Sequence, residues 1–178
     1  MSSDILIPAW EEGVLRPVEK LAVHARALRH PAISVFVMDG DKTLIQQRAL
    51  TKYHTPGLWA NACCTHPHWG ESMARCAARR LNEELGISGL PLRPRGQLEY
   101  RAEVGGGLTE HEVVSVFVGD ASEGSLSIAP NPDEVHATEW VTLDELRTRI
   151  ETDPKSYTPW LAIYLAQHAD QIFNQSAA

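Results

Sequence analysis

The chain has 178 residues, of which 43% are hydrophobic and 22% are charged, and these values suit one soluble globular domain. Its net charge of −7 argues against a general binder of nucleic acid or membrane surfaces, although local cations could still hold an anionic small molecule. Three cysteines, an N-terminus without a basic start and the lack of a long apolar run predict a cytoplasmic protein with reduced thiols and no membrane span.

The first half of the chain contains a short helix followed by extended segments. Residues 18–30, VEKLAVHARALRH, are predicted to form a helix that leads into a loop. Residues 31–49, PAISVFVMDGDKTLIQQRA, are expected to form two strands around a turn at Gly40-Asp41, which is a hairpin signal. Residues 57–64, GLWANACC, are interpreted as one further extended run that is entered through a Pro56-Gly57 turn.

The clearest helix is predicted for residues 72–86, SMARCAARRLNEELG. Met73, Ala77, Leu81 and Leu85 form an apolar stripe at a spacing of four residues, and Gly86 stands where a C-terminal cap belongs. This helix is expected to pack one face against a core.

The second half is predicted to hold a hairpin, a strand and two helices. Residues 97–104 and 109–120 flank three consecutive glycines and favour a hairpin. Residues 136–146 indicate a strand followed by a helix, with Thr142 and Glu145 at capping-box spacing. Thr158 and Pro159 are expected to start the last helix. Strands on both sides of a central helix predict a mixed α/β sandwich.

The stretch NACCTHPHWGE, residues 61–71, is dense in groups that can carry chemistry. If residues 60–66 are extended, Cys64 and His66 face one side of the strand and Cys63 faces the other. The two cysteines are therefore not expected to act as a pair. From this stretch alone, two small buried residues and one reactive thiol remain equally acceptable interpretations.

Residues 65–87 partly match the spacing of a Nudix box, in which a helix presents carboxylates to divalent cations that hold a diphosphate. Two positions depart, because Thr65 stands in place of a glycine and Arg80 in place of a glutamate. A solvated helix face with ion pairs four residues apart would explain the same residues. The residues in register are Glu71, Arg79, Glu83, Glu84 and Gly86.

Four motifs around this box, EKLAVHARALRH, WANACCTHPHWGE, LTEHEV and YTPW, occur in this order along the chain. Together they closely resemble the type I isopentenyl-diphosphate isomerases over nearly the whole length. The resemblance implies a single Nudix-like domain over residues 1–178, with a mixed β-sheet sandwiched between helices and an N-terminal extension, residues 1–30, that contributes metal ligands. Isomerases of this type also depart from the hydrolase box, so Thr65 and Arg80 fit the family.

The implied reaction interconverts isopentenyl diphosphate and dimethylallyl diphosphate through a tertiary carbocation. It needs an acid, a base on the opposite face of the substrate and exclusion of water. The resemblance assigns the acid/base pair to Cys64 and Glu112. The residues agree in part, since Glu110 and Glu112 share a strand face with Val114, where unpartnered carboxylates would be costly.

The resemblance also implies two metal sites and a basic diphosphate site. One ion, Mn²⁺, Zn²⁺ or Mg²⁺, would bind among His24, His30, His66, Glu110 and Glu112. Glu84 would bind a Mg²⁺ that bridges to the diphosphate. The basic side chains near that group would be Lys20, Arg48, Lys52 and Arg80.

Two aromatic residues complete the implied site. Trp160 would lie over the reacting carbons, where an indole face can stabilise a cation, and Tyr100 would hydrogen-bond the catalytic glutamate. Each could instead be an ordinary core residue. His68 and His111 match no ligand position, and we interpret them as bystanders.

Two other functions remain open from sequence. A Nudix hydrolase of a nucleoside diphosphate derivative would share the fold, but Arg80 replaces a metal-binding glutamate of that class. A metal-stabilised binding module would bind diphosphates without turnover. In each case we expect a small-molecule ligand, no nucleic acid, no membrane, and a monomer with a dimer as the alternative.

Overall fold

The computed structural model of the chain describes residues 5–174, which form one α/β domain. No helix in this part of the chain is long and apolar enough to cross a membrane. The strands are β1 (Leu6–Glu11), β2 (Val14–Glu19), β3 (His30–Asp39), β4 (Lys42–Arg48), β5 (Trp59–Asn61), β6 (Cys63–Thr65), β7 (Arg93–Gly105), β8 (Leu108–Asp120) and β9 (Val135–Thr142). The helices are α1 (Lys20–Ala25), α2 (Met73–Leu85), α3 (Leu143–Thr152), α4 (Pro159–Gln167) and α5 (Ala169–Phe173), with a 3₁₀ turn at Pro154–Ser156.

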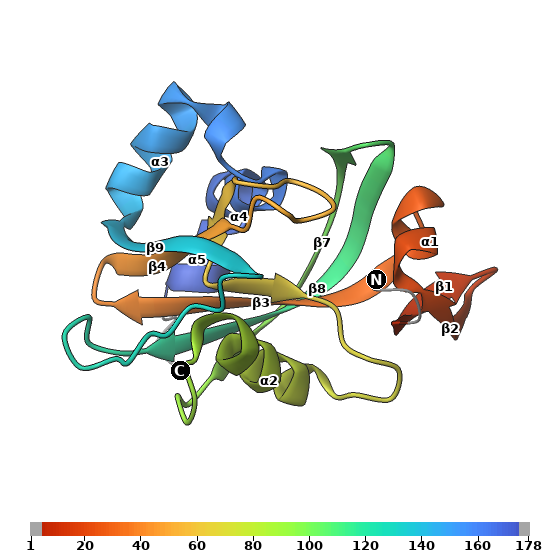
Figure 1. Cartoon of the computed structure of the whole chain (residues 1–178), viewed down its shortest axis with the longest axis horizontal. Coiled ribbons are helices and arrows are strands. Elements are labelled where there is room, and N and C mark those ends of the chain that lie inside the picture. Colours follow the sequence, from red (N-terminus) through yellow and green to blue (C-terminus); the bar gives the residue numbers. More distant parts are fainter. Residues whose placement is uncertain (1–4, 175–178) are drawn as a thin grey trace.

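A mixed sheet forms the centre of the domain (Figure 1). Its main path runs β5-β4-β3-β8-β7, and β6 and β9 pair with β3 and β4. β3 and β8 are parallel, whereas the other pairs are antiparallel. The parallel register places His30 opposite Glu112, so the start of β3 lies beside the carboxylates of β8.

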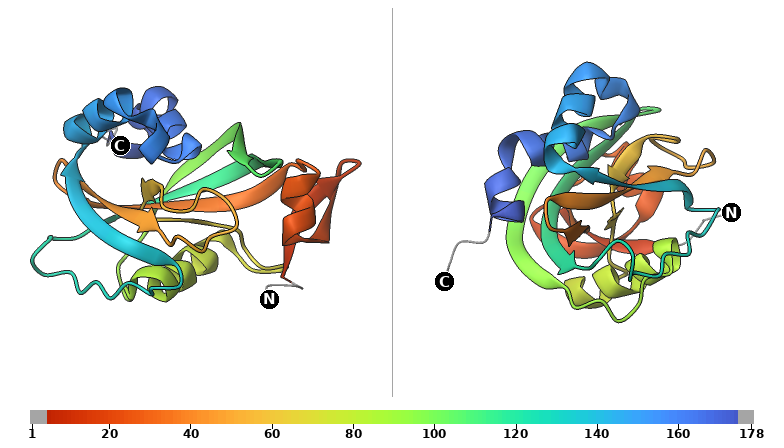
Figure 2. Two further views of the ribbon diagram at one scale, coloured as in Figure 1. Left: turned by 45° about the horizontal axis from the view of Figure 1, so that its top comes forward. Right: turned by 90° about the vertical axis from the view of Figure 1, so that its left-hand side faces the viewer.

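Hydrophobic residues of β3 serve two cores, one on each face of the sheet. Ala32 and Phe36 pack with the helices α3, α4 and α5, while Ile33 and Val35 pack with α2. Figures 1 and 2 show these two helical layers on opposite sides of the sheet. Burial on both faces explains why β3 reads as a continuous apolar run instead of an alternating one. The predicted sandwich is confirmed.

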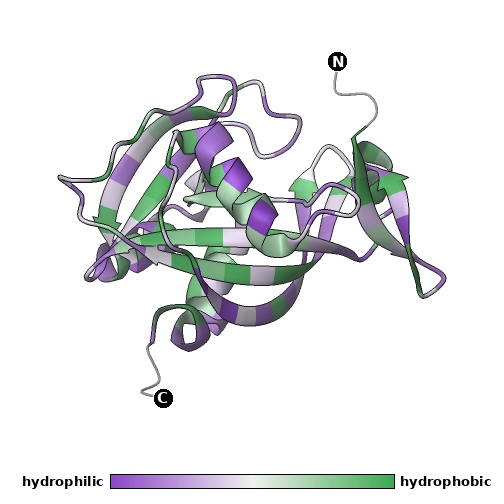
Figure 3. Cartoon of the chain, turned by 90° about the horizontal axis from the view of Figure 1, so that it is seen from below, coloured by the Kyte–Doolittle hydropathy of each residue, from purple (hydrophilic) through white to green (hydrophobic). Residues whose placement is uncertain are grey.

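The central helix is confirmed, and α2 ends as its sequence predicted. Ala77, Leu81 and Leu85 are buried against the sheet, and hydrophilic residues occupy the outer side of the helix (Figure 3). Gly86 has a φ of 67° and donates its N–H to the carbonyl of Asn82. A Cβ at this position would lie 2.8 Å from the Cβ of Ala129, so both the conformation and the space require glycine.

The N-terminal region differs from the prediction. Helix α1 spans only Lys20–Ala25, because Val14–Glu19 form a strand that pairs with Leu6–Glu11. Glu19 caps the short helix by accepting N–H groups of Leu21 and Ala22. This hairpin was not predicted, and it has a small core of its own made by Ile7, Ala9, Val18 and Val23.

Other elements agree with the predictions except in three details. Both hairpins form, and Thr142 accepts the N–H of Glu145 at the start of α3. The extended run 57–64 forms two strands, because β5 pairs with β4 whereas β6 pairs with β3. At the break between them, the Asn61 side chain donates to the carbonyls of Val35 and Cys63. Thr158 makes no side-chain capping bond, and α5 follows the helix predicted to be last.

Candidate active site

One pocket collects most of the side chains that the sequence singled out. It opens where β4, β6 and β8 meet α2 and the start of α4. His24 and His30 are fully buried beside it and contact Glu110. The predicted residues that line the pocket are Lys20, Arg48, Lys52, Cys64, His66, Arg80, Glu84, Tyr100, Glu110, Glu112 and Trp160.

Three imidazoles and a carboxylate converge at the inner end of this pocket. The Oε2 atom of Glu110 lies 3.0 Å from Nε2 of His24 and 3.2 Å from Nε2 of His30. Ligand atoms of His24, His30, His66 and Glu110 all lie within 4.8 Å of one another. Glu112 adjoins the group through an Oε1–Nε2 distance of 2.8 Å to His66. We call His24, His30, His66, Glu110 and Glu112 the His/Glu cluster.

The ring orientations leave nitrogen lone pairs directed into the His/Glu cluster. Nδ1 of His24 is 2.5 Å from the carbonyl of Lys20, and Nδ1 of His30 is 2.7 Å from that of Leu28. A carbonyl only accepts, so both Nδ1 atoms carry hydrogen and both Nε2 atoms can ligate. Among residues 5–174, these Nε2 atoms and Glu110 Oε2 have no partner with hydrogen-bond geometry. The donor set therefore fits a divalent cation.

Electrostatics favour positive charge in the same place. Burial alone would raise the pKa of Glu110, but contacts with the surrounding histidines hold it well below its usual range. Burial alone would lower the pKa of His30, yet its close contacts with the carboxylates of Glu110 and Glu112 raise it to about 10. Two ionised carboxylates in a buried site need a cation, which a metal ion would supply.

Cys64 is held in a chain of polar groups on one side of the sheet. Its thiol donates to Oδ1 of Asn61 at 2.9 Å, and its sulfur is also 2.9 Å from Oγ of Ser34. The amide of Asn61 is fixed by its two backbone bonds, so the acceptor oxygen faces the sulfur. Ser34 then donates to the sulfur and accepts from Tyr164 at 2.9 Å.

The two adjacent thiols have different surroundings, as the alternation of a strand predicts. Cys63 is fully buried between α2 and the face of the sheet that α2 covers, whereas Cys64 lines the pocket. Burial raises the pKa of Cys64 to about 12, although the hydroxyl of Ser34 opposes this shift. Cys64 therefore rests as a thiol at neutral pH.

Glu112 faces the pocket with both carboxylate oxygens occupied. Nε2 of His66 lies 2.8 Å from Oε1, and the hydroxyl of Tyr100 donates to Oε2 at 2.8 Å. Tyr100 occupies the position opposite Glu112 on β7, so strand register brings the two groups together. One carboxylate thus connects the His/Glu cluster to a phenol at the wall of the pocket.

Trp160 forms part of the pocket wall at the start of α4. Its side chain is buried, and the guanidinium carbon of Arg48 lies 5.4 Å from its ring centroid. The ring therefore already contacts one cation. Its indole N–H has no hydrogen-bond partner within the described residues.

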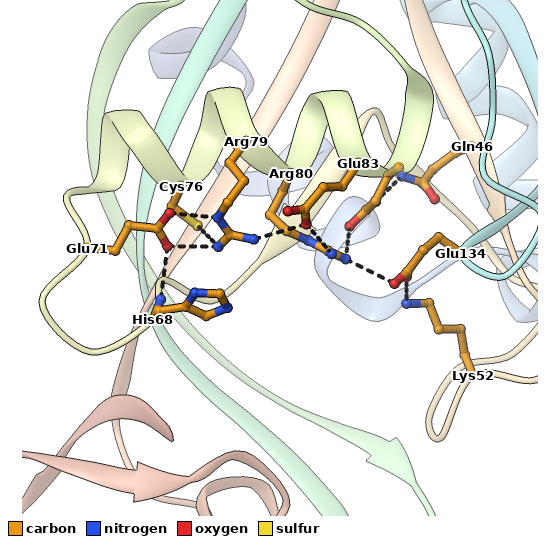
Figure 4. Close-up of polar contacts among 10 residues, drawn as sticks. Gln46, Lys52, His68, Glu71, Cys76, Arg79, Arg80, Glu83 and Glu134 are labelled. Atoms are coloured by element: carbon orange, nitrogen blue, oxygen red, sulfur yellow. Dashed lines mark hydrogen bonds and ion pairs between the residues drawn. The ribbon is translucent and has the colours of Figure 1, made fainter. Parts of the chain in front are cut away.

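The outer end of the pocket is a network of ion pairs on α2 (Figure 4). Arg80 donates to Glu84 at 2.7 Å and to Glu83 at 2.8 Å, and it lies 3.4 Å from Glu134. Glu134 also pairs with Lys52. The helix α2 therefore shows features of both interpretations of the Nudix box. Its charged residues form ion pairs along the helix, and Arg80 and Glu84 also line the pocket.

Cations gather at this outer end. Burial, followed by the nearby charges of Lys52 and Arg80, lowers the pKa of Lys20 to about 8. Arg48 donates to the backbone carbonyls of His54 and Thr55, which holds it in place. Several cationic side chains lie close enough to lower the pKa of Lys20, and such a cluster can bind a small anionic group.

Some residues in the pocket or supporting it were missed from sequence. His54 reaches Glu110 from a loop, Glu134 reaches Arg80 and Lys52 from the segment before β9, and Ser34 with Tyr164 supports Cys64. The sequence carries no spacing signal for these contacts, because each joins elements that are far apart in the chain. His68 and His111, interpreted as bystanders, lie outside the His/Glu cluster, and His111 contacts Glu99.

Comparisons with known proteins decide the family. Residues 28–161 match the NUDIX domain model. The chain is 63% identical over 168 residues to an isopentenyl-diphosphate Delta-isomerase of Rhodobacter capsulatus, covering 94% of this chain and 95% of that protein. The chain belongs to the isopentenyl-diphosphate Delta-isomerase family of Nudix proteins. This membership confirms the resemblance read from the four motifs and makes the chain an isomerase.

Further comparisons agree with this family. An isopentenyl-diphosphate Delta-isomerase of Dinoroseobacter shibae is 60% identical over 172 residues, with 97% of both chains covered. A solved structure from Deinococcus radiodurans superposes with a TM-score of 0.73 at 18% identity and covers 91% of this chain and 97% of that one. At this identity the structural likeness concerns the Nudix fold alone.

Proposed function

We propose that the chain interconverts isopentenyl diphosphate and dimethylallyl diphosphate by adding one proton and removing another across the pocket. The observation that carries this proposal is the meeting of a thiol, Cys64, and a carboxylate, Glu112, in one pocket with an indole and a basic cluster. The thiol and the carboxylate come from different strands, β6 and β8, and both line the pocket, so a substrate bound there would have two proton-transfer groups beside it.

The proton balance follows from the two isomers. A proton adds to the terminal alkene carbon and leaves a tertiary cation, and loss of a proton from the carbon nearer the diphosphate forms the new double bond. One group gives a proton and the other takes one, so no oxidant or reductant is needed. Cys64 starts as a thiol because burial raises its pKa. Glu112 starts ionised because contacts with His30 and His66 lower its pKa in spite of its burial and the neighbouring charge of Glu110. Tyr100 hydrogen-bonds Glu112 and would position its carboxylate.

The His/Glu cluster would hold one divalent ion, Mn²⁺, Zn²⁺ or Mg²⁺. Its ligands would be His24, His30, His66, Glu110 and Glu112, with the first two histidines supplied by the N-terminal part of the chain. When bound, the ion would supply positive charge that keeps the neighbouring carboxylates ionised. Histidine nitrogens and carboxylate oxygens suit each of these metals.

The outer end of the pocket would bind the diphosphate. Lys20, Arg48, Lys52 and Arg80 supply cations, and Glu84 would ligate a Mg²⁺ that also contacts the diphosphate. Arg80 and Glu84 are paired with each other in the structure, so binding would exchange part of that pair for contacts with the ligand and its ion. These local charges accommodate an anion in a chain with a net charge of −7.

Trp160 would stabilise the carbocation. An indole face attracts a cation without forming a bond to it, whereas a carboxylate at the same place could capture it. Burial of Trp160 and of the reacting end of the pocket supports the exclusion of water that such an intermediate requires. We also propose that this small-molecule enzyme acts as a monomer in the cytoplasm.

The test is turnover of isopentenyl diphosphate with Mg²⁺ and Mn²⁺ present. We expect dimethylallyl diphosphate as the product and no release of phosphate or pyrophosphate. The matched control is Cys64→Ala, which keeps the metal and diphosphate residues. Release of inorganic phosphate or pyrophosphate without the isomer would favour a hydrolase, and tight binding without any turnover would favour a binding module.

A further inference from the structure

His54 lies against the back of the Glu110 carboxylate, although no sequence pattern connects them. The loop between β4 and β5 carries His54, which is buried, and its Nε2 atom lies 3.1 Å from Oε1 of Glu110. His24 and His30 approach the other oxygen, Oε2. Glu110 therefore directs Oε2 into the His/Glu cluster, while His54, outside the cluster, contacts Oε1.

The contacts of His54 favour hydrogen on Nε2. An ionised carboxylate can only accept, so the contact between Nε2 of His54 and Oε1 of Glu110 is attractive when Nε2 carries hydrogen. Nδ1 is then a lone-pair acceptor, and the hydroxyl of Thr55 lies 2.9 Å from it. The hydroxyl of Thr55 can donate to that nitrogen, so this contact is compatible with hydrogen at Nε2, the atom that faces Glu110.

The backbone around these residues is held in an unusual conformation. Thr55 has a φ of 46°, a left-handed value that is rare for a β-branched residue. Arg48 donates to the carbonyls of His54 and Thr55, both at 3.2 Å. Strain of this kind persists where surrounding contacts enforce it and is concentrated at functional sites.

We propose that His54 is a positioning residue that holds Oε1 of Glu110 and thereby aims Oε2 at the metal ion of the His/Glu cluster. The inference rests on the proposed metal centre. A free carboxylate could rotate, whereas one oxygen fixed by an N–H donor leaves the other in a single place. Groups that hydrogen-bond a metal ligand from outside commonly change metal affinity by roughly 10- to 100-fold when they are lost.

Titration of the metal-free full chain with Mn²⁺ alone tests the proposal, with free Mn²⁺ followed by electron paramagnetic resonance and no diphosphate present. His54→Phe keeps a ring beside Trp160, whose centroid is 6.0 Å from that of His54, but removes the N–H donor. His54→Gln keeps an N–H donor without the ring. His136→Phe, at an exposed histidine on β9, controls for a general effect of the substitution.

We expect His54→Phe to weaken Mn²⁺ binding by roughly 10- to 100-fold, and His54→Gln to recover most of that loss. Thr55→Val should give a smaller loss, because it removes only the hydroxyl that contacts Nδ1 of His54. Melting temperatures of the metal-free proteins separate misfolding from weakened binding, and a correctly folded His54→Phe should regain turnover at high Mn²⁺.

Three outcomes count against this role. Parent-like Mn²⁺ binding by His54→Phe would show that Glu110 needs no such support. Equal losses in the Phe and Gln variants would indicate that the imidazole is itself a ligand. If the parent chain binds no Mn²⁺, the proposed metal centre fails, and the positioning role fails with it.

Discussion

At the inner end of the pocket, buried nitrogen and oxygen atoms of His24, His30 and Glu110 meet without hydrogen-bond geometry, whereas at the outer end Arg80 and Glu84 hold each other in a closed ion pair. The inner groups come from three elements of the chain, α1, β3 and β8. The outer groups come chiefly from one helix, α2.

The difference indicates how each end would bind its ligand. Buried polar atoms without partners are costly, so the inner end gains stability when a cation fills it. At the outer end Nε of Arg80 also lacks a partner among residues 5–174, but the guanidinium is already paired with Glu84 and lies near Glu134, so a diphosphate must compete with these carboxylates. We therefore expect a tight, resident ion at the inner end and a weaker, exchangeable Mg²⁺–diphosphate complex at the outer end.

The largest expected contrast lies between the two adjacent thiols, Cys63 and Cys64. Cys64→Ala should abolish turnover, because Cys64 faces the pocket, whereas Cys63→Ala should keep most turnover and cost about 1 kcal/mol of stability from lost packing. Steady-state rates and melting temperatures check both expectations. Equal losses of turnover in the two variants would contradict the assignment of the two faces.

Substitution of one glutamate at each end tests the contrast itself. Glu110→Gln should lower the affinity of the resident ion by more than the roughly 100-fold typical of outer-shell changes, and turnover should fall with it. Glu84→Gln should leave that ion in place and raise the KM for the diphosphate about tenfold, equivalent to about 1.4 kcal/mol, because it weakens the ligand of the Mg²⁺ that accompanies the diphosphate. Elemental analysis and kinetics in graded Mg²⁺ measure the two effects. An active enzyme without bound metal after purification in metal-replete buffer would refute the resident ion.

Substitutions of Trp160 are expected to have an effect of intermediate size on turnover. Trp160→Leu should lower turnover roughly thirtyfold, equivalent to about 2 kcal/mol of transition-state stabilisation, with Trp160→Phe between Leu and the parent. A residue that only packs would instead lower the melting temperature and leave the turnover of folded protein unchanged. Parent-like turnover in the Leu variant would assign Trp160 to the core alone.

The smallest expected effect concerns the pH dependence of thiol labelling. Burial raises the pKa of Cys64 from 9.0 to about 12, so the fraction of thiolate should stay low through pH 9 and rise only above it. Mass spectrometry of Cys64 after brief alkylation, from pH 7 to pH 11 and below the unfolding range, follows this fraction. Half-maximal labelling near pH 8 would mean that the thiol is less buried than the structure indicates.

Local and alternating patterns made much of the fold predictable. The stripe from Met73 to Leu85 and the glycine after it specified α2, and strand alternation separated Cys63 from Cys64. The hairpin at Leu6–Glu19 was missed, because its turn and its short core carry weak signals. The split between β5 and β6 depends on the Asn61 side chain bonding to a strand far away in sequence.

The same distinction applies to the candidate site. Motifs that resemble a known family led to side chains that the structure gathers in one pocket, although their roles stay predictions. His54 and Glu134 were not found, because their partners are set by folding and not by spacing. Loop residues that reach across a pocket in this way need the three-dimensional arrangement before they can be recognised.

The central claim is that protons are added and removed across the pocket between Cys64 and Glu112. Its most direct measurement is nuclear magnetic resonance of the products formed from isopentenyl diphosphate in D₂O, with Mg²⁺ and Mn²⁺ present. We predict deuterium in a methyl group of dimethylallyl diphosphate, and none in products from Cys64→Ala or Glu112→Gln at matched protein concentration. Conversion without deuterium, with the metal sites filled, would contradict proton addition from groups that exchange with solvent.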